Sequence, residues 1–101
     1  MTEPELERLR GRISEIDAEL IELLGRRMRL CSEIGRIKSR EGLQIEVKEV
    51  ERRILKRALE LSREKGLEEE LTKAVFRSVL KYSKERQRRE RRGASDSDLG
   101  T

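Results

Sequence analysis

The chain has 101 residues, of which 46% are charged, 34% hydrophobic and 2% aromatic, and its formal net charge is +4. This length allows at most one modest domain, and the apolar content suits helix seams better than a thick globular core. With no histidine and the single cysteine Cys31, these residues cannot form an internal disulfide, and we expect no metal site. The first residues lack the pattern of a signal peptide and no apolar run approaches about 18 residues, so we expect a cytoplasmic protein without a membrane span.

A first long helix is predicted from about Thr2, a candidate N-cap, to about Arg40, with a stop near Gly42. Its apolar residues recur at spacings of three and four: Leu6, Leu9, Ile13, Ile16, Leu20, Leu23, Leu30, Ile34 and Ile37. Such a pattern is typical of a helix that packs along its length against other helices. One helical hairpin would leave part of this stripe in water, so we expect the chain to associate with itself.

Two further helices are predicted, and together with the first they make the expected all-α fold. Residues 41–46 connect to a helix from about Val47 to Lys65, which Gly66 ends. Its expected inner face comprises Val50, Ile54, Leu55, Ala58 and Leu61. The third helix is expected from near Glu68 to about Arg91, with one inner row of Leu71, Val75, Val79 and Tyr82 and a second of Phe76 and Leu80. Helical steps continue the second row into the polar residues Ser83 and Gln87. The domain is thus expected to cover residues 1–92, followed by a polar, disordered tail over residues 93–101.

Arg27 occupies the vacant position in the seam of the first helix. A buried guanidinium requires an anionic partner. Lys38 follows eleven positions later, on the same face about 16 Å along the helix, so the two cations suggest a pocket for an anion such as a dicarboxylate. Arg10 precedes Arg27 by 17 residues, about 25 Å away and rotated by about 100°. One straight helix cannot bring both arginines to one small ligand, but an antiparallel second chain can. The alternative is that Arg27 forms a buried ion pair that sets helix register, with Glu51 as candidate partner, while Arg10 and Lys38 are solvated.

With these residues in place, the chain resembles the all-helical, intracellular class of chorismate mutases over about residues 5–88. The motifs that carry the resemblance are Leu9-Arg10 with Ile13, Ile16-Asp17, Leu23-Leu24 followed by Arg26-Arg27, Gly35-Arg36-Ile37-Lys38, Glu51-Arg52, and Phe76 with Ser83 and Gln87. Each motif is short, but their order and spacing together are specific.

The resemblance implies an intertwined homodimer of three helices per chain, with two sites shared between the chains. In such a site Arg27, and Arg10 from the other chain, bind carboxylates of the substrate, and Lys38 and Gln87 donate to its ether oxygen. The remaining contacts are made by Glu51 with the ring hydroxyl, by Ser83 near a carboxylate, and by the backbone of Val47. Many members carry an arginine where this chain has Val50. Either Arg52, Lys48 or Arg53 compensates for this loss, or the substrate is bound more weakly. The proline common in the preceding loop is also absent, with Gln44 near its place.

The implied reaction is the pericyclic rearrangement of chorismate to prephenate in phenylalanine and tyrosine biosynthesis. It needs no cofactor, nucleophile or general base, only orientation of a dianion and stabilisation of charge on the ether oxygen. One alternative is an isochorismate-pyruvate lyase of the same fold, against which Glu51 argues. A second is a non-catalytic helical dimerisation module. The basic segment 84–92 is expected to be a solvated helix end, whose cations suit the negative end of the helix dipole. Nucleic-acid binding by this segment is not expected, because no aromatic residues interleave its cations.

Overall fold

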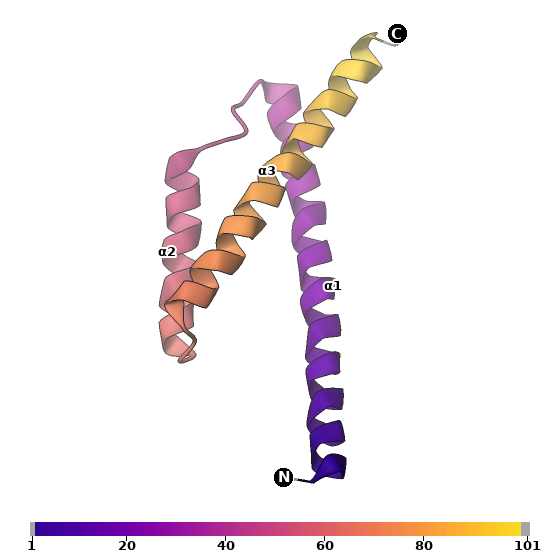
Figure 1. Cartoon of the computed structure of the whole chain (residues 1–101). Coiled ribbons are helices and arrows are strands. Elements are labelled where there is room, and N and C mark those ends of the chain that lie inside the picture. The colour runs from indigo at the N-terminus through magenta and orange to yellow at the C-terminus, as the bar shows by residue number, and fades with distance from the viewer. Residues whose placement is uncertain (1, 100–101) are drawn as a thin grey trace. The chain divides into compact units, whose positions relative to one another are not determined.

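The structure of the chain is a computed structural model that describes residues 2–99, and the side chains among them as far as residue 93. These residues form three helices and no strand: α1 (Glu3–Glu41), α2 (Lys48–Glu64) and α3 (Glu69–Leu99) (Figure 1). The predicted all-α fold of three helices is therefore confirmed. None of the described helices has the length and apolar character that a membrane crossing requires.

The chain divides into two compact units, Met1–Leu30 and Cys31–Thr101. The first unit is the N-terminal part of α1. It starts with a reciprocal cap, in which the Glu5 amide donates to Thr2 Oγ1 at 3.3 Å and the Thr2 amide donates to Glu5 Oε2 at 2.9 Å. The predicted N-cap is confirmed. Most apolar seam residues of this unit are more than half exposed in the chain, from Leu20 at 53% to Leu30 at 58%, whereas Leu6 and Leu9 are half-buried.

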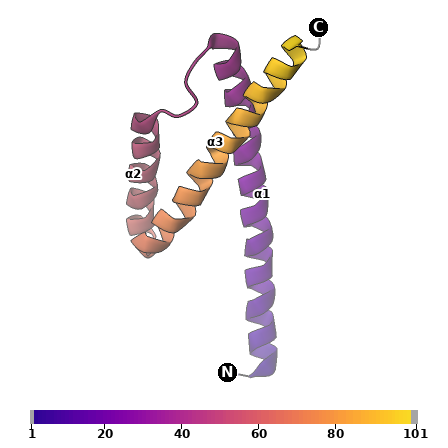
Figure 2. The same cartoon turned by 45° about the horizontal axis from the view of Figure 1, so that its top comes forward.

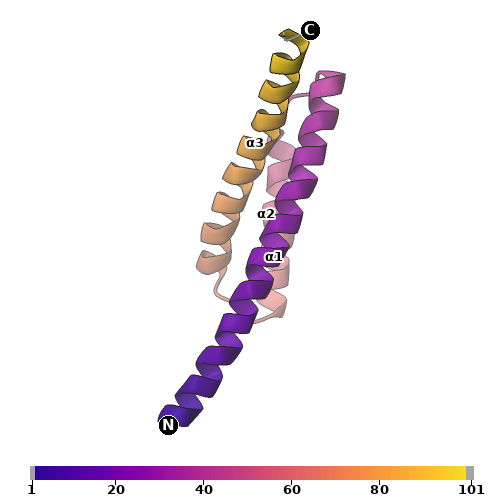
Figure 3. The ribbon, with the colours of Figure 1, turned by 90° about the vertical axis from the view of Figure 1, so that its right-hand side faces the viewer.

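The second unit contains the last turns of α1 together with α2 and α3. From the turn at residues 65–68, α3 returns along α2 (Figure 2). Figure 3 shows the last turns of α1 beside the C-terminal half of α3. The apolar core is small, and polar side chains share the interior with it: the buried residues are Cys31, Ala58 and Val79 with Gly35, Ser32, Ser62, Thr72, Ser83 and Gln87.

Two glycines end helices as predicted, and both do so through a left-handed backbone. Gly42 has φ +67° and Gly66 has φ +66°. In each case the residue after the glycine donates a backbone hydrogen bond to the carbonyl five residues before it. These bonds run from the Leu43 amide to the Lys38 carbonyl at 2.8 Å and from the Leu67 amide to the Ser62 carbonyl at 2.9 Å. This is the Schellman arrangement, which satisfies carbonyls that would otherwise lack a partner.

Helix α3 does not end where the sequence pattern placed its end. It was expected to stop near Arg91, but it continues to Leu99. Gly93 is not among the glycines with positive φ, so the backbone passes through it in helical conformation. Residues 93–99 of the predicted disordered tail therefore belong to α3, while residues 100–101 lie outside the described part of the chain.

The predicted inner rows of α2 and α3 are only partly right. Of the first α3 row, Val79 is buried, but Leu71, Val75 and Tyr82 are 46–58% exposed in the chain. The physical reason is the small size of the residues at the α2–α3 contact. Ser62 Oγ lies 2.8 Å from Thr72 Oγ1 and donates to the Leu67 carbonyl at 3.0 Å. Small side chains let the helices approach closely, and larger apolar ones are left on the flanks. On α2 the same pattern holds: Ala58 is buried, Ile54 and Leu55 are half-buried, and Val50 and Leu61 are exposed.

Candidate functional site

Two polar side chains of α3 face the interior of the second unit. Ser83 is 6% exposed and Gln87 is 8% exposed, as the continuation of the Phe76 and Leu80 row predicted. Ser83 Oγ donates to the Val79 carbonyl one turn earlier, at 2.6 Å. Gln87 Oε1 is buried and has no hydrogen-bond partner among the described residues. A buried polar atom without a partner costs about 1–3 kcal/mol, and folds retain such groups where a ligand can satisfy them. The Gln87 amide is therefore a candidate ligand-binding group.

The position of Gln87 depends on a close approach between α1 and α3. A Cβ atom built on Gly35 would lie 2.8 Å from Gln87 Cα and 3.0 Å from the Gln87 carbonyl oxygen. Only glycine leaves room for this approach. The close contact therefore explains why a glycine lies here, although glycine inside a helix costs about 1 kcal/mol relative to alanine. The Gly35 backbone thus sets how far Gln87 stands from the last turns of α1.

Lys38 lies one turn after Gly35, near the end of α1, and is half-buried. Its Nζ donates to the Ile45 carbonyl at 2.8 Å, so the loop after α1 anchors the ammonium. Burial, and after it the positive charge of Arg91, lower the pKa of Lys38, while Cys31 and Glu51 act in the opposite direction. Lys38 is therefore a partly desolvated cation within electrostatic reach of Glu51.

Arg91 of α3 secures the same end of α1. Its Nη2 donates to the Lys38 carbonyl at 3.2 Å and also to the Leu43 carbonyl. Both acceptors belong to the C-terminal turn of α1 and its loop, where carbonyls lack helical partners. Sequence reasoning treated the basic segment 84–92 as a solvated helix end and so missed this role of Arg91. The sequence showed only that the cations of this segment suit the C-terminal end of a helix, and it gave no indication that Arg91 would bind carbonyls of α1.

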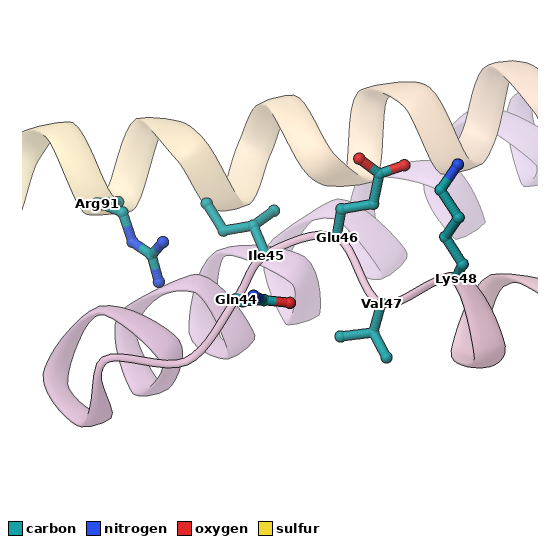
Figure 4. A pocket seen from close by; sticks show the side chains of 6 residues that line it. All are labelled: Gln44, Ile45, Glu46, Val47, Lys48 and Arg91. Carbon is teal, nitrogen blue, oxygen red and sulfur yellow. The ribbon is translucent and has the colours of Figure 1, made fainter.

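A groove of about 600 Å³ opens beside this loop, lined by Gln44, Ile45, Glu46, Val47, Lys48 and Arg91. Figure 4 shows Arg91 reaching from α3 toward the loop and the Glu46 carboxylate turned toward α3. The Val47 side chain points away from α3 in the same view. The Val47 carbonyl accepts from the Glu51 amide at 3.1 Å and so joins the loop to α2.

Glu51 stands in the first turn of α2 and pairs with a lysine of α3. Lys84 Nζ lies 2.9 Å from Glu51 Oε1 and 3.4 Å from Glu46 Oε1. The hydrogen bond to Glu51, and less strongly the one to Glu46, raise the pKa of Lys84 against the opposing effect of burial. Lys84 was not among the residues that the sequence singled out for the site.

Four of the predicted side chains thus belong to the second unit: Lys38 near the end of α1, Glu51 at the start of α2, and Ser83 and Gln87 in the later turns of α3. Arg91 links α3 to the end of α1, and Lys84 links α3 to the start of α2. The two predicted arginines belong to the first unit. Arg10 is exposed, and its Nη1 donates to Glu7 Oε1 at 3.0 Å; Arg27 is half-buried. No group of three or more metal-binding side chains occurs among the described residues.

Comparison with known proteins identifies relatives of the chain. Residues 9–88 match the family described as chorismate mutase type II. The chain is 37% identical over 79 residues to the T-protein of Enterobacter agglomerans, an alignment that covers 78% of this chain and 21% of the relative. It is 45% identical over 60 residues to the bifunctional chorismate mutase/prephenate dehydratase of Aquifex aeolicus, covering 59% of this chain and 17% of the relative. The chorismate mutase of Methanocaldococcus jannaschii is 28% identical over 79 residues, covering 78% of this chain and 80% of the relative. The chain thus spans only about a fifth of the first two relatives.

Proposed function

Because the chain belongs to the chorismate mutase type II family, as its motifs predicted, we propose that it catalyses the rearrangement of chorismate to prephenate. The observation that carries the proposal is the family match over residues 9–88, which includes all seven residues predicted for the site. The anchored ammonium of Lys38 and the buried amide of Gln87 also support it, since the chemistry needs fixed donors in a shielded place.

The reaction breaks the ether C–O bond and forms a C–C bond within one molecule, and no proton is transferred. Negative charge grows on the ether oxygen as the bond breaks, so Lys38 and Gln87 are assigned as its hydrogen-bond donors. One N–H of the Lys38 ammonium is used by the Ile45 carbonyl, which holds the group in place and leaves two donors for the substrate. The Gln87 amide can present either of its ends after a half turn of its last side-chain bond.

The other site residues orient the substrate. Arg27, and Arg10 from a second copy of the chain, are assigned to the two carboxylates of chorismate, since guanidinium groups bind carboxylates in a two-pronged geometry. Glu51 is assigned to the ring hydroxyl, Ser83 to a carboxylate, and Val47 to a contact through its backbone. Holding a flexible dianion in its reactive conformer removes much of the entropic part of the barrier.

We infer that the active form is a homodimer. Arg10 and Arg27 lie on one helix, 17 residues apart, which corresponds to about 25 Å along the axis and about 100° around it. A second copy can supply the Arg10 that the first copy cannot bring to its own site. The exposed seam of α1, including Ile13, Ile16, Leu20 and Leu23, gives the second copy an apolar surface to cover.

We further propose that the enzyme works in the cytoplasm, in the biosynthesis of phenylalanine and tyrosine. The absence of a membrane-crossing helix among the described residues is compatible with this placement. A bifunctional relative, whose name also includes prephenate dehydratase, supports the biosynthetic assignment.

The test is a spectrophotometric assay of chorismate loss by the purified chain, with identification of the product. Prephenate is expected from chorismate, and no salicylate is expected from isochorismate. Salicylate formation would instead indicate an isochorismate-pyruvate lyase. A folded dimer that consumes neither substrate would leave the helical dimerisation module as the better description.

A further inference from the structure

Building on the proposed function, we propose that Lys84 is a positioning residue of the active site, which holds the Glu51 carboxylate in the orientation that meets the substrate hydroxyl. The residues that the sequence offered as replacements for a cation at Val50 were Arg52, Lys48 and Arg53. The structure favours a residue of α3 that is 33 positions after Glu51 in the sequence.

The first support is the geometry of the ion pair. Lys84 Nζ approaches Glu51 Oε1 to 2.9 Å, and the two side chains are only 23% and 22% exposed. A pair shielded to this degree is screened less by water and salt than the surface pairs of the same chain. Arg52, in contrast, is 71% exposed and lies 3.9 Å from Glu49. The side chain of Arg52 therefore lies on the surface of α2 beside Glu49, and it is not the cation that orients Glu51.

The second support is that Lys84 is held from two sides. Its Nζ also lies 3.4 Å from Glu46 Oε1, in the loop that precedes α2. The two carboxylates approach the ammonium from the loop and from α2, and both act to raise the pKa of Lys84. Lys84 thus ties the loop, α2 and α3 together at the point where Glu51 must be oriented.

The third support is that the pairing leaves Glu51 able to bind a ligand. Lys84 contacts Oε1, and a carboxylate offers about four acceptor positions on its two oxygens. Glu51 Oε2 therefore remains to accept the substrate hydroxyl. The charges of Lys38 and Glu51 also interact, so the carboxylate lies within electrostatic reach of two cations.

A double-mutant cycle tests the proposal. Lys84→Gln is expected to lower kcat/KM about tenfold, mainly through KM, because a charge-assisted hydrogen bond that orients a binding group is lost. In a Glu51→Gln background the same change is expected to cost less than about twofold, since Lys84 acts through Glu51.

Two controls separate positioning from folding. Lys81→Gln removes an exposed lysine of the same helix and should leave kcat/KM unchanged. Lys84→Arg keeps the charge and should retain most of the activity, even if Lys84→Gln folds poorly. Unchanged kcat/KM in Lys84→Gln, or an equal loss in both Glu51 backgrounds, would overturn this inference and leave the proposed function standing. A wild-type chain inactive toward chorismate would overturn the proposed function, and the inference with it.

Discussion

A single methyl group added at Gly35 is expected to disturb the contact that positions Gln87. The new Cβ of Gly35→Ala would lie 2.8 Å from Gln87 Cα, 3.0 Å from its carbonyl oxygen and 3.1 Å from Glu90 Cβ. The favourable van der Waals separation of two non-bonded carbon atoms is about 3.5–4.0 Å, so α1 and α3 must separate by roughly half an ångström or more at this contact. Two of the three obstructing atoms belong to the backbone of α3 and cannot move away by a change of rotamer.

Two opposing effects determine the expected change in stability. Alanine is favoured over glycine inside a helix by about 1 kcal/mol, whereas overpacking at a tight contact typically costs about 1–3 kcal/mol. Gly11→Ala is the matched control, because Gly11 lies inside α1, opposite the seam, and a Cβ there meets nothing within 4 Å. We expect Gly11→Ala to stabilise the chain and Gly35→Ala to be less stable than this control by about 1–3 kcal/mol.

Urea denaturation followed by circular dichroism measures the difference. Both variants should be compared at one protein concentration, because the stability of a dimer depends on it. The displacement should also lower kcat, by about tenfold or more, since small misplacements of catalytic groups are costly. If Gly35→Ala were as stable as Gly11→Ala and as active as the wild type, the close approach would not set the position of Gln87.

Three further substitutions test the site. Lys38→Ala should lower kcat by a factor on the order of 10²–10³ with an unchanged circular dichroism spectrum, and near-normal turnover would remove Lys38 from the mechanism. Inactive Arg10→Ala and Arg27→Ala chains, mixed and allowed to exchange subunits, should recover activity through one intact site per heterodimer; no recovery after verified exchange would argue against a shared site. Arg91→Ala removes a positive charge that lowers the pKa of Lys38, so that pKa should rise and the alkaline limb of kcat should move to higher pH. An unshifted limb, measured over the same pH range, would show that Arg91 does not act on Lys38 in this way.

Features that depend on neighbouring residues followed from the sequence alone. Three helices, the cap at Thr2 and the stops at Gly42 and Gly66 are local, because each depends on hydrophobic periodicity or on a backbone conformation that glycine adopts readily. The polar row through Ser83 and Gln87 was also visible as a helical repeat, and both residues are buried. The family could be predicted too, because its motifs keep their order along the chain.

What the sequence could not supply are relations between distant segments. The pattern contained two apolar rows on α3, and only the close approach of small residues such as Ser62 and Thr72 decided which residues of these rows are buried. Periodicity likewise gave no sign that Lys84 would meet Glu51 or that Arg91 would cap α1, contacts that span 33 and 53 positions. A helical repeat specifies which side chains share a face, but the partner of that face depends on how the helices pack, and the packing alone decides which charges become a pair.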